Sequence, residues 1–313
     1  MAAIRTGTNS KNYFPFSVSN DQVLWLRSAK SVWSPVLRRL GVHQPLSTLP
    51  QVLSRCQTVK KPKSMQGLKI EMAETYEAMS RLAEKLIITE LKRHPNLLLC
   101  ASAGETPTRT FALLADRYKT HPRLFAHLRV LQIDEWAGLP RDSTALCQLD
   151  LEKKLLEPLQ VSPKRYQGFK SNAPDLEREC CRVAKWLAEN GPIDICLLGL
   201  GVNGHIGMNE PAAEFSPGVH LARLARSSQK HPLLASLPNK PSHGLTLGMA
   251  DILRSRKTLL LVSGRKKRRA FERLMAPRVT TKLPASFLWL HPETTILCDK
   301  EAWGQRAPGS KVM

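Results

Sequence analysis

Apolar residues follow two patterns along this chain, one typical of helices and one typical of buried strands. From Ile70 onward they recur at spacings of three and four, which predicts one amphipathic helix that ends near His94 and Pro95. Short continuous apolar runs predict buried strands at residues 97–101, 128–133, 193–200 and 258–262.

Helical patterns lie between and after these runs. Thr106 is suited to an N-cap and Pro107 to a first helical position, so a helix is expected from there through Arg117. Further helices are expected over 144–156, over 175–189 and, rich in basic residues, after Val262. Because buried strands alternate with helices, the sequence predicts an α/β fold: a single Rossmann-like domain over 65–313, with a mainly parallel sheet covered by helices on both faces.

Residues 1–64 differ in composition from the rest of the chain. They hold ten Lys and Arg against one acid, Asp21, are rich in Ser and Pro, and show no sustained helical or strand period. We interpret this stretch as a basic, disordered N-terminal extension, or as translation assigned too early with Met65 near the start of the folded domain. The alternative is an organellar transit peptide, but Trp25, Trp33 and the prolines interrupt any long amphipathic face.

The formal net charge of +21 raises the question of a polyanionic partner. The extension carries +9 of it, and residues 65–313 carry the other +12, from 37 basic and 25 acidic residues. The densest basic run, Arg265 to Arg269, lacks interleaved aromatic residues for base stacking, and helical geometry turns only some of its members toward any one ligand. No helix-turn-helix or zinc pattern accompanies it, so we expect no nucleic-acid partner.

Cysteine content and hydropathy indicate the compartment. The seven cysteines form no CxxC pair, which favours a reducing cytoplasm and no structural zinc. No apolar run approaches the roughly 18 residues of a membrane-spanning helix, so no membrane partner is expected. We therefore expect a cytoplasmic protein.

Candidate chemistry gathers in three segments, each placed just after a predicted strand. In open α/β sheets ligands bind beyond the carboxyl ends of the strands, so these segments should meet at one rim. They are Ser102–Pro107, the Asp134-Glu135-Trp136 triplet, and the glycine-rich stretch 201–211.

The three segments suggest different tasks. The first offers backbone N–H groups and the Thr106 hydroxyl to an anion such as phosphate, although a simple capped turn explains it equally well. The second provides a carboxylate that partial burial would turn into a base, unless the pair merely ends a strand in solvent. The third joins His205, which is able to titrate near neutrality, to the carboxylate of Glu210 among glycines that permit tight turns.

Gly199, Gly201 and Gly204 match the spacing of a dinucleotide-binding fingerprint. That fingerprint requires a helix to begin at the glycines. Here Gly207 and Pro211 oppose a helix, and no strand ending in an acid lies about 20 residues on. We therefore expect no nucleotide cofactor.

Taken together, the motifs resemble the glucosamine-6-phosphate deaminase and 6-phosphogluconolactonase superfamily, and more closely its galactosamine-6-phosphate isomerase/deaminase branch. The resemblance runs in order over about residues 70–300, in the blocks Ser102–Pro107, IDEWAGLP (133–140), LGLGVNGHIGMNEP (198–211), LTLGMADIL (245–253), SGRKK (263–267) and PASFLWLH (284–291). The last block and Trp136 favour the galactosamine branch.

The resemblance implies a role for each matching residue. Asp134 would move the proton between C1 and C2 of the opened amino sugar, His205 would open the ring, and Glu210 would orient that imidazole. Gly104 and Thr106 would lie at the phosphate loop, and Lys267 would contribute positive charge to the phosphate. No metal and no organic cofactor is implied.

Three departures from the family pattern affect these roles. Asn203 stands where many deaminases carry an Asp, so it can hold a hydrogen bond but cannot stabilise an imidazolium by charge; galactosamine-type sequences share this Asn. Ala103 and Glu105 replace hydroxyl and small residues of the phosphate loop, and Glu105 must point away from the phosphate or binding weakens. The second phosphate-binding Arg has no evident match around 229–234, where Lys230 or His231 would have to substitute.

The implied reaction is aldose–ketose isomerisation with deamination of an amino sugar 6-phosphate, from galactosamine-6-phosphate to tagatose-6-phosphate and ammonia. Because water releases the ammonia, the enzyme is expected to be a hydrolase as well as an isomerase. The alternatives are a glucosamine-6-phosphate deaminase, a 6-phosphogluconolactonase and, from a different class, a sugar-phosphate-sensing regulator that binds nucleic acid through its basic tail. The expected partner is a sugar phosphate, and self-association into a homo-oligomer is compatible with the sequence.

Overall fold

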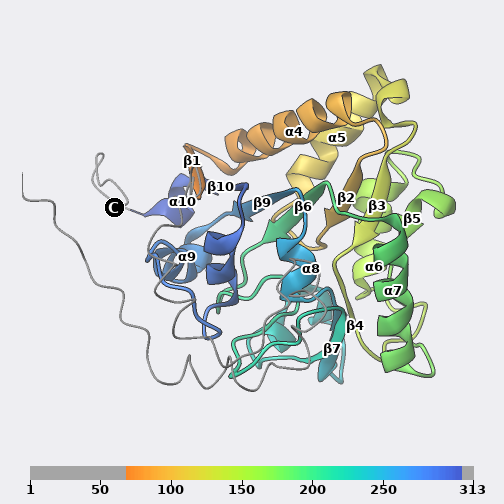
Figure 1. The fold of residues 1–313 in the computed structure, drawn as a ribbon, viewed down its shortest axis with the longest axis vertical. Helices are drawn as coiled ribbons and strands as arrows, with labels where there is room; N and C mark the ends of the chain where they lie inside the picture. The colour runs from red at the N-terminus through yellow and green to blue at the C-terminus, as the bar shows by residue number, and fades with distance from the viewer. Residues whose placement is uncertain (1–67, 305–313) are drawn as a thin grey trace, which may run out of the picture. The chain divides into compact units, whose positions relative to one another are not determined.

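A computed structural model describes residues 68–304 and shows a seven-stranded sheet at the centre of the domain (Figure 1). The strand order is β1-β10-β9-β6-β2-β3-β5, and every pairing between neighbours is parallel. The strands are β1 (Lys69–Ala73), β2 (Leu98–Ala101), β3 (Arg129–Gln132), β5 (Tyr166–Gln167), β6 (Ile195–Gly199), β9 (Lys257–Val262) and β10 (Thr294–Asp299). The predicted parallel sheet is confirmed, whereas the expected extension at 1–64 lies outside the described residues.

Helices cover both faces of this sheet. They are α4 (Tyr76–Arg93), α5 (Thr108–Thr120), α6 (Cys147–Leu151), α7 (Leu176–Asn190), α8 (Met249–Leu253), α9 (Arg268–Leu274) and α10 (Lys300–Trp303). Successive strand side chains point to opposite faces, so Leu99 packs in one buried cluster with α4 and α5, whereas Leu98 and Cys100 pack in another with α7 and α9. Figure 1 shows α4 and α5 on one side of the sheet and α8 and α9 on the other. Burial on both faces explains why the central strands β2, β6 and β9 are almost entirely apolar.

The expected helix that starts at Ile70 is wrong in its first turn. Residues 69–73 form the edge strand β1, which pairs with β10. Helix α4 begins only after Thr75, whose side chain accepts a hydrogen bond from the N–H of Ala78. Apolar residues at every second position fit a strand as well as the first turn of a helix. The apolar pattern alone therefore assigned residues 69–73 to the helix that follows them.

Two other helices begin later than the sequence pattern indicates. Helix α5 starts at Thr108 with Pro107 as its cap, so Thr106 is not the N-cap and its hydroxyl is free of that task. The helix expected from residue 144 starts at Cys147 and continues as a π-helical turn, η4 (Glu152–Leu156).

A second, three-stranded antiparallel sheet was not predicted. It consists of β4 (Asp134–Trp136), β8 (His243–Thr246) and β7 (His220–Arg223), in the order β4-β8-β7. Strand β4 follows β3 after a single residue, Ile133, and carries the chain out of the parallel sheet. The small sheet therefore directs the Asp134 triplet beyond the carboxyl end of the large one.

The topology also marks where a ligand should bind. From β2 the chain moves outward to β3 on one side, while β6, β9 and β10 extend the sheet on the other side. Such a switch point between β2 and β6 opens a crevice at the carboxyl ends of the strands. Among the described residues, no helix is long and apolar enough to cross a membrane.

Candidate active site

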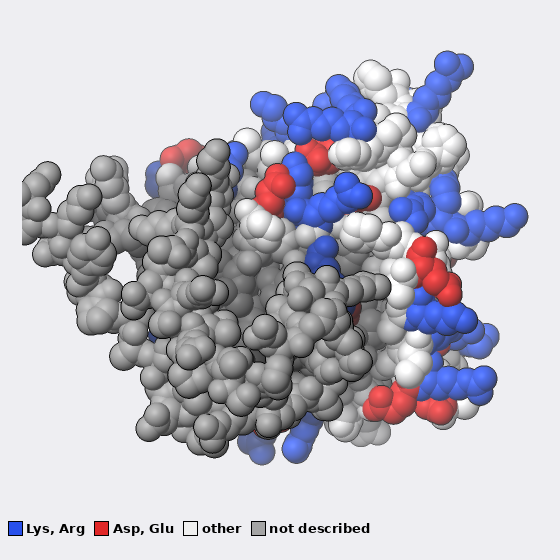
Figure 2. Space-filling model, in the orientation of Figure 1, with Lys and Arg blue, Asp and Glu red and all other residues white. Residues whose placement is uncertain are grey.

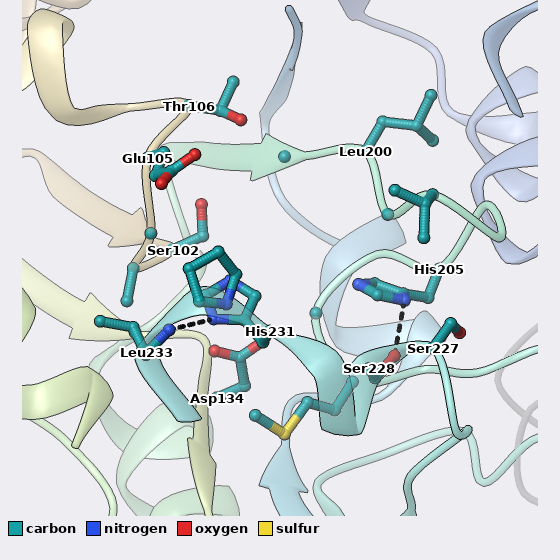
Figure 3. Close-up of a pocket in the computed structure, with 18 of the residues that line it drawn as sticks. Ser102, Glu105, Thr106, Asp134, Leu200, His205, Ser227, Ser228, His231 and Leu233 are labelled. Atoms are coloured by element: carbon teal, nitrogen blue, oxygen red, sulfur yellow. Dashed lines mark hydrogen bonds between the residues drawn. The ribbon is translucent and has the colours of Figure 1, made fainter. Parts of the chain in front are cut away.

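A cavity of about 630 Å³ lies at this switch point and collects side chains from all three predicted segments. Asp134, His205, Glu210, Gly104, Thr106 and Lys267 line it, whereas Asn203 stands behind its wall. Further lining residues come from the stretch 226–233. In Figure 3, Asp134 and His205 lie on separate walls, with the Ser102–Thr106 segment above them.

Asp134 reaches the cavity because β4 alternates its side chains. Asp134 and Trp136 face the cavity, whereas Glu135 between them is fully buried on the other side. Glu135 accepts hydrogen bonds from the N–H groups of Trp136, Cys147 and Gln148 and from the Gln132 amide, so this carboxylate is fixed as a structural anchor.

The environment of Asp134 makes it a plausible base. Burial, followed by the neighbouring charge of Glu135, raises the pKa of the Asp134 carboxyl to about 7. A carboxylate with a pKa near neutrality binds a proton far more strongly than an ordinary Asp does, yet is still ionised in a large fraction of molecules at pH 7. That combination suits a group that must both remove and return a proton.

His205 is held by its Nδ1 atom. This nitrogen lies 3.4 Å from Glu210 Oε2 and 3.2 Å from the Ser228 hydroxyl, a contact drawn in Figure 3. An imidazole whose Nδ1 faces a carboxylate carries a proton on that nitrogen, so Nε2 is left to exchange protons with a ligand.

Glu210 remains ionised although it is buried. Burial alone would raise its pKa, but the hydrogen bond and charge of His205, with further hydrogen bonds from Ser228 and Asn203, lower it to about 2. The pKa values of two carboxyl groups in one cavity are thus shifted in opposite directions: that of Asp134 is raised and that of Glu210 is lowered. Such a separation is typical of sites that divide acid–base tasks between residues.

Asn203 acts on this pair from outside the cavity. Its amide donates to Glu210 Oε2 at 2.8 Å and to the Ser227 hydroxyl at 3.1 Å, and its carbonyl accepts the N–H of His205 at 3.1 Å. It touches the His205 backbone and not the ring, so the geometry makes Asn203 a positioning residue.

The loop after β6 contains no helix, as the sequence analysis expected. The N–H of Gly201 donates to the carbonyl of His205 and the N–H of Gly204 to the carbonyl of Gly201, which folds the segment back on itself. A Cβ at Gly201 would lie 2.5 Å from the His205 ring, so glycine is needed here to let the imidazole pack.

The Ser102–Pro107 loop is held by groups that the sequence did not reveal. Gly104 has a φ of +103°, and its N–H donates to Asp150 Oδ2 at 2.9 Å. Asp150 also pairs with Lys154. The Tyr76 hydroxyl donates to the carbonyls of Glu105 and Thr106. Gly104 therefore shapes the turn, and its N–H would have to leave Asp150 before it could bind a phosphate.

Basic side chains line the same cavity as this loop. Of the run Arg265–Arg269, Lys266 and Lys267 line the cavity. Burial lowers the pKa of Lys267, and the charge of Glu105 opposes that shift. On the part of the face that Figure 2 shows uncovered, blue side chains gather along the top and the right edge, with fewer red ones among them. Two members of the run therefore contribute positive charge to the cavity.

Sequence reasoning missed most of the wall supplied by 226–233. Arg226, Ser227, Ser228 and Leu233 line the cavity, and so do Lys230 and His231, the two residues considered as substitutes for a missing Arg. Burial, then the charges of His205 and Lys267, lower the pKa of His231. No motif marks this stretch, so only its position beyond β7 reveals it. Within residues 68–304, no three His, Cys, Asp or Glu side chains gather closely enough to hold a metal ion.

Residues 71–297 match the model of the family described as glucosamine-6-phosphate isomerases/6-phosphogluconolactonase. The chain belongs to this family. Within the glucosamine-6-phosphate isomerase family, it is 35% identical to the Escherichia coli K12 protein named "Putative deaminase AgaI", over 71% of this chain and 88% of that one. It is 33% identical to glucosamine-6-phosphate deaminase 1 of Bacillus subtilis 168, over 75% of this chain and 98% of that one.

Solved structures of family members agree with the fold. A glucosamine-6-phosphate deaminase described as monomeric is 32% identical, with a TM-score of 0.71 over 75% of this chain and 98% of that one. A 6-phosphogluconolactonase from Trypanosoma brucei, 22% identical with a TM-score of 0.61 over 75% of this chain and 97% of that one, shows the fold alone. The expected hydrolase class is wrong, because the relatives that carry sequence similarity are deaminases of an isomerase family.

Proposed function

We propose that this protein deaminates an amino sugar 6-phosphate, with galactosamine-6-phosphate as the preferred substrate and tagatose-6-phosphate and ammonia as products. The observation that carries the proposal is one cavity in which Asp134 has a raised pKa, Glu210 has a lowered pKa and contacts His205, and lysines line part of the wall. The similarity to named deaminases supports the activity, and Trp136 together with the block at 284–291 supports the galactosamine preference.

We assign each group a step that its position supports. His205 Nε2 exchanges the proton that passes between O1 and O5 as the sugar ring opens. Asp134 takes the proton from C2 and returns it to C1, while O1 gains a proton and the amine loses one, so that the amino aldose becomes a ketose imine with a hydroxyl at C1. Water then adds to the imine carbon and ammonia leaves, so one water is consumed for each ammonia released. Glu210 keeps His205 oriented throughout.

The phosphate would lie between the Ser102–Thr106 loop and Lys267. The Thr106 hydroxyl is free of helix capping, and Arg226, Lys230 and Lys266 add positive charge around the same cavity. A sugar phosphate bound in this way has its phosphate near the loop and its reacting carbons near Asp134.

Two alternatives share the fold. A glucosamine-6-phosphate deaminase differs from the proposed enzyme only in the substrate configuration at C4, and several relatives carry that name. A 6-phosphogluconolactonase would need no base at a sugar C–H bond, so the raised pKa of Asp134 favours the deaminase.

A coupled ammonia assay with the two epimeric amino sugar phosphates tests the proposal. We expect faster ammonia release from galactosamine-6-phosphate. Faster release from glucosamine-6-phosphate would establish the first alternative. Loss of 6-phosphogluconolactone without ammonia from either epimer would refute deamination.

Glu105 provides a separate prediction about phosphate affinity. Its carboxylate shares the cavity with Lys267, so it repels a phosphate dianion and competes for the lysine charge. We expect Glu105→Ser to lower KM about tenfold with little change in kcat, because the repulsion acts equally on ground and transition states. Glu105→Asp, which keeps the charge, is the matched control. An unchanged KM in Glu105→Ser would show that the carboxylate points away from the phosphate.

The cytoplasmic location, the absence of a nucleic-acid partner and self-association remain predictions from the sequence. A nucleic-acid retardation assay and a sedimentation measurement on the full chain address the last two.

A further inference from the structure

Trp136 has a buried polar atom without a partner. Its side chain is only 4% exposed, it lines the cavity, and its Nε1–H finds no acceptor among the described residues. A buried indole N–H is normally hydrogen bonded, because leaving it unpaired costs free energy. By contrast, the indole of Trp289 donates to the carbonyl of Leu274.

A second unpartnered atom lies in the same cavity. The hydroxyl oxygen of Ser102 is buried and has no hydrogen-bond partner within the described part of the chain. Ser102 follows β2, and Figure 3 shows it at the loop that faces Asp134. The other polar groups near His205, such as Glu210 and Ser228, are bonded to one another. Among the buried polar atoms of the described residues that have no partner, those of Ser102 and Trp136 belong to residues that line the cavity.

The position of Trp136 indicates which ligand oxygen it meets. Trp136 lies two residues after Asp134 on the same face of β4, about 7 Å further along the strand. Its ring lies 5.5 Å from that of His231, between centroids. A Cβ built on Gly104 would in turn be 3.5 Å from Nε2 of His231. Trp136 is thus close to Asp134 along β4, and its neighbour His231 in turn lies close to Gly104 of the phosphate loop.

A substrate that places C1 and C2 at Asp134 and its phosphate at the loop must lay its middle carbons along this wall. We propose that Trp136 is a specificity-determining residue: its indole N–H donates to a hydroxyl oxygen on the C3–C5 segment of the sugar, and Ser102 provides a second polar contact there. The identity of the sugar rests on the proposed function. The contact itself rests on the unpartnered donors.

Trp136 also packs in a small buried cluster, which by itself would explain an aromatic residue. Met208, Leu139 and Leu234 belong to this cluster. Packing needs the ring but not the N–H group. Trp136→Phe therefore removes the donor while keeping most of the apolar contact, and Trp186→Phe on α7, away from the cavity lining, is the matched control.

The test measures the binding of reduced, open-chain amino hexitol 6-phosphates by calorimetry, which needs no turnover. We expect Trp136→Phe to bind the galacto-configured compound about 10- to 100-fold more weakly than the wild type does. One of the 3-deoxy, 4-deoxy and 5-deoxy compounds should bind both proteins equally, because it lacks the hydroxyl that the indole contacts. Ser102→Ala should also weaken binding of the parent compound.

Equal affinity of Trp136→Phe and the wild type for the parent compound would overturn the inference, as would an equal loss with every deoxy compound. The ammonia assay separates this outcome from failure of the proposed function. If the wild type releases ammonia but Trp136→Phe binds normally, only the specificity role fails. If the wild type releases none yet the deoxy pattern holds, the contact stands and deamination fails.

Discussion

Replacement of Asp134 by Asn is expected to reduce ammonia release by about 10⁴-fold, to near the background rate, while the protein still binds the sugar phosphate. The amide keeps the size of the side chain but cannot accept the C2 proton, so the isomerisation loses its base. Binding should persist because the groups proposed for the phosphate lie on other walls of the cavity. Single-turnover ammonia release and calorimetric binding of an amino hexitol phosphate measure the two effects separately.

Asp142→Asn is the matched control. Asp142 is an exposed carboxylate in the turn that follows β4 and is not part of the cavity wall. The control should leave kcat within about twofold of the wild type, as is usual for exposed substitutions. Ammonia release by Asp134→Asn at the wild-type rate would remove Asp134 from the proton transfer and with it the proposed mechanism.

The parallel strands that position this site could be predicted from the sequence, because each strand is marked by a short local pattern of apolar residues. Continuous apolar runs located β2, β3, β6 and β9, and the rule that ligands bind beyond their carboxyl ends brought Asp134, His205 and Lys267 together. The predicted element boundaries were less accurate where the apolar positions of one element continue without a break into the next, as from β1 into α4.

The parts that escaped prediction depend on contacts between distant residues. Asp150 holds Gly104 across 46 positions of the chain, and Ser228 meets His205 across 23. The sheet of β4, β8 and β7 has strands of only three or four residues, too short for a reliable period. The raised pKa of Asp134 depends on burial that only the assembled cavity provides.

The opposite shifts of Asp134 and Glu210 also predict opposite effects on stability. Asp134 has a folded pKa of about 7 against an ordinary value of 3.8, so between these pH values the folded state holds a proton that the unfolded state has lost. Stability therefore falls as pH rises through this window. By pH 8 the ionisation of Asp134 lowers the free energy of unfolding by about 4 kcal/mol, because its folded and ordinary pKa values differ by about three units. The Asp134→Asn variant has no carboxylate to ionise, so it should be more stable than the wild type at pH 8. The difference in stability should be smaller at pH 5 and should almost vanish near pH 3.5.

Glu210 has the reverse sign. Its folded pKa of about 2 lies below the ordinary 4.5, so the unfolded state binds more protons between these values, and the stabilisation is complete above about pH 4.5. Glu210→Gln should lose about 3 kcal/mol at pH 5 and above, and the deficit should shrink as pH falls toward 2. Urea unfolding of both variants and the wild type at pH 5 and pH 8 compares them directly. An Asp134→Asn protein no more stable than the wild type at pH 8 would mean that Asp134 is an ordinary solvated carboxylate, because only a desolvated base imposes a cost that its own removal relieves.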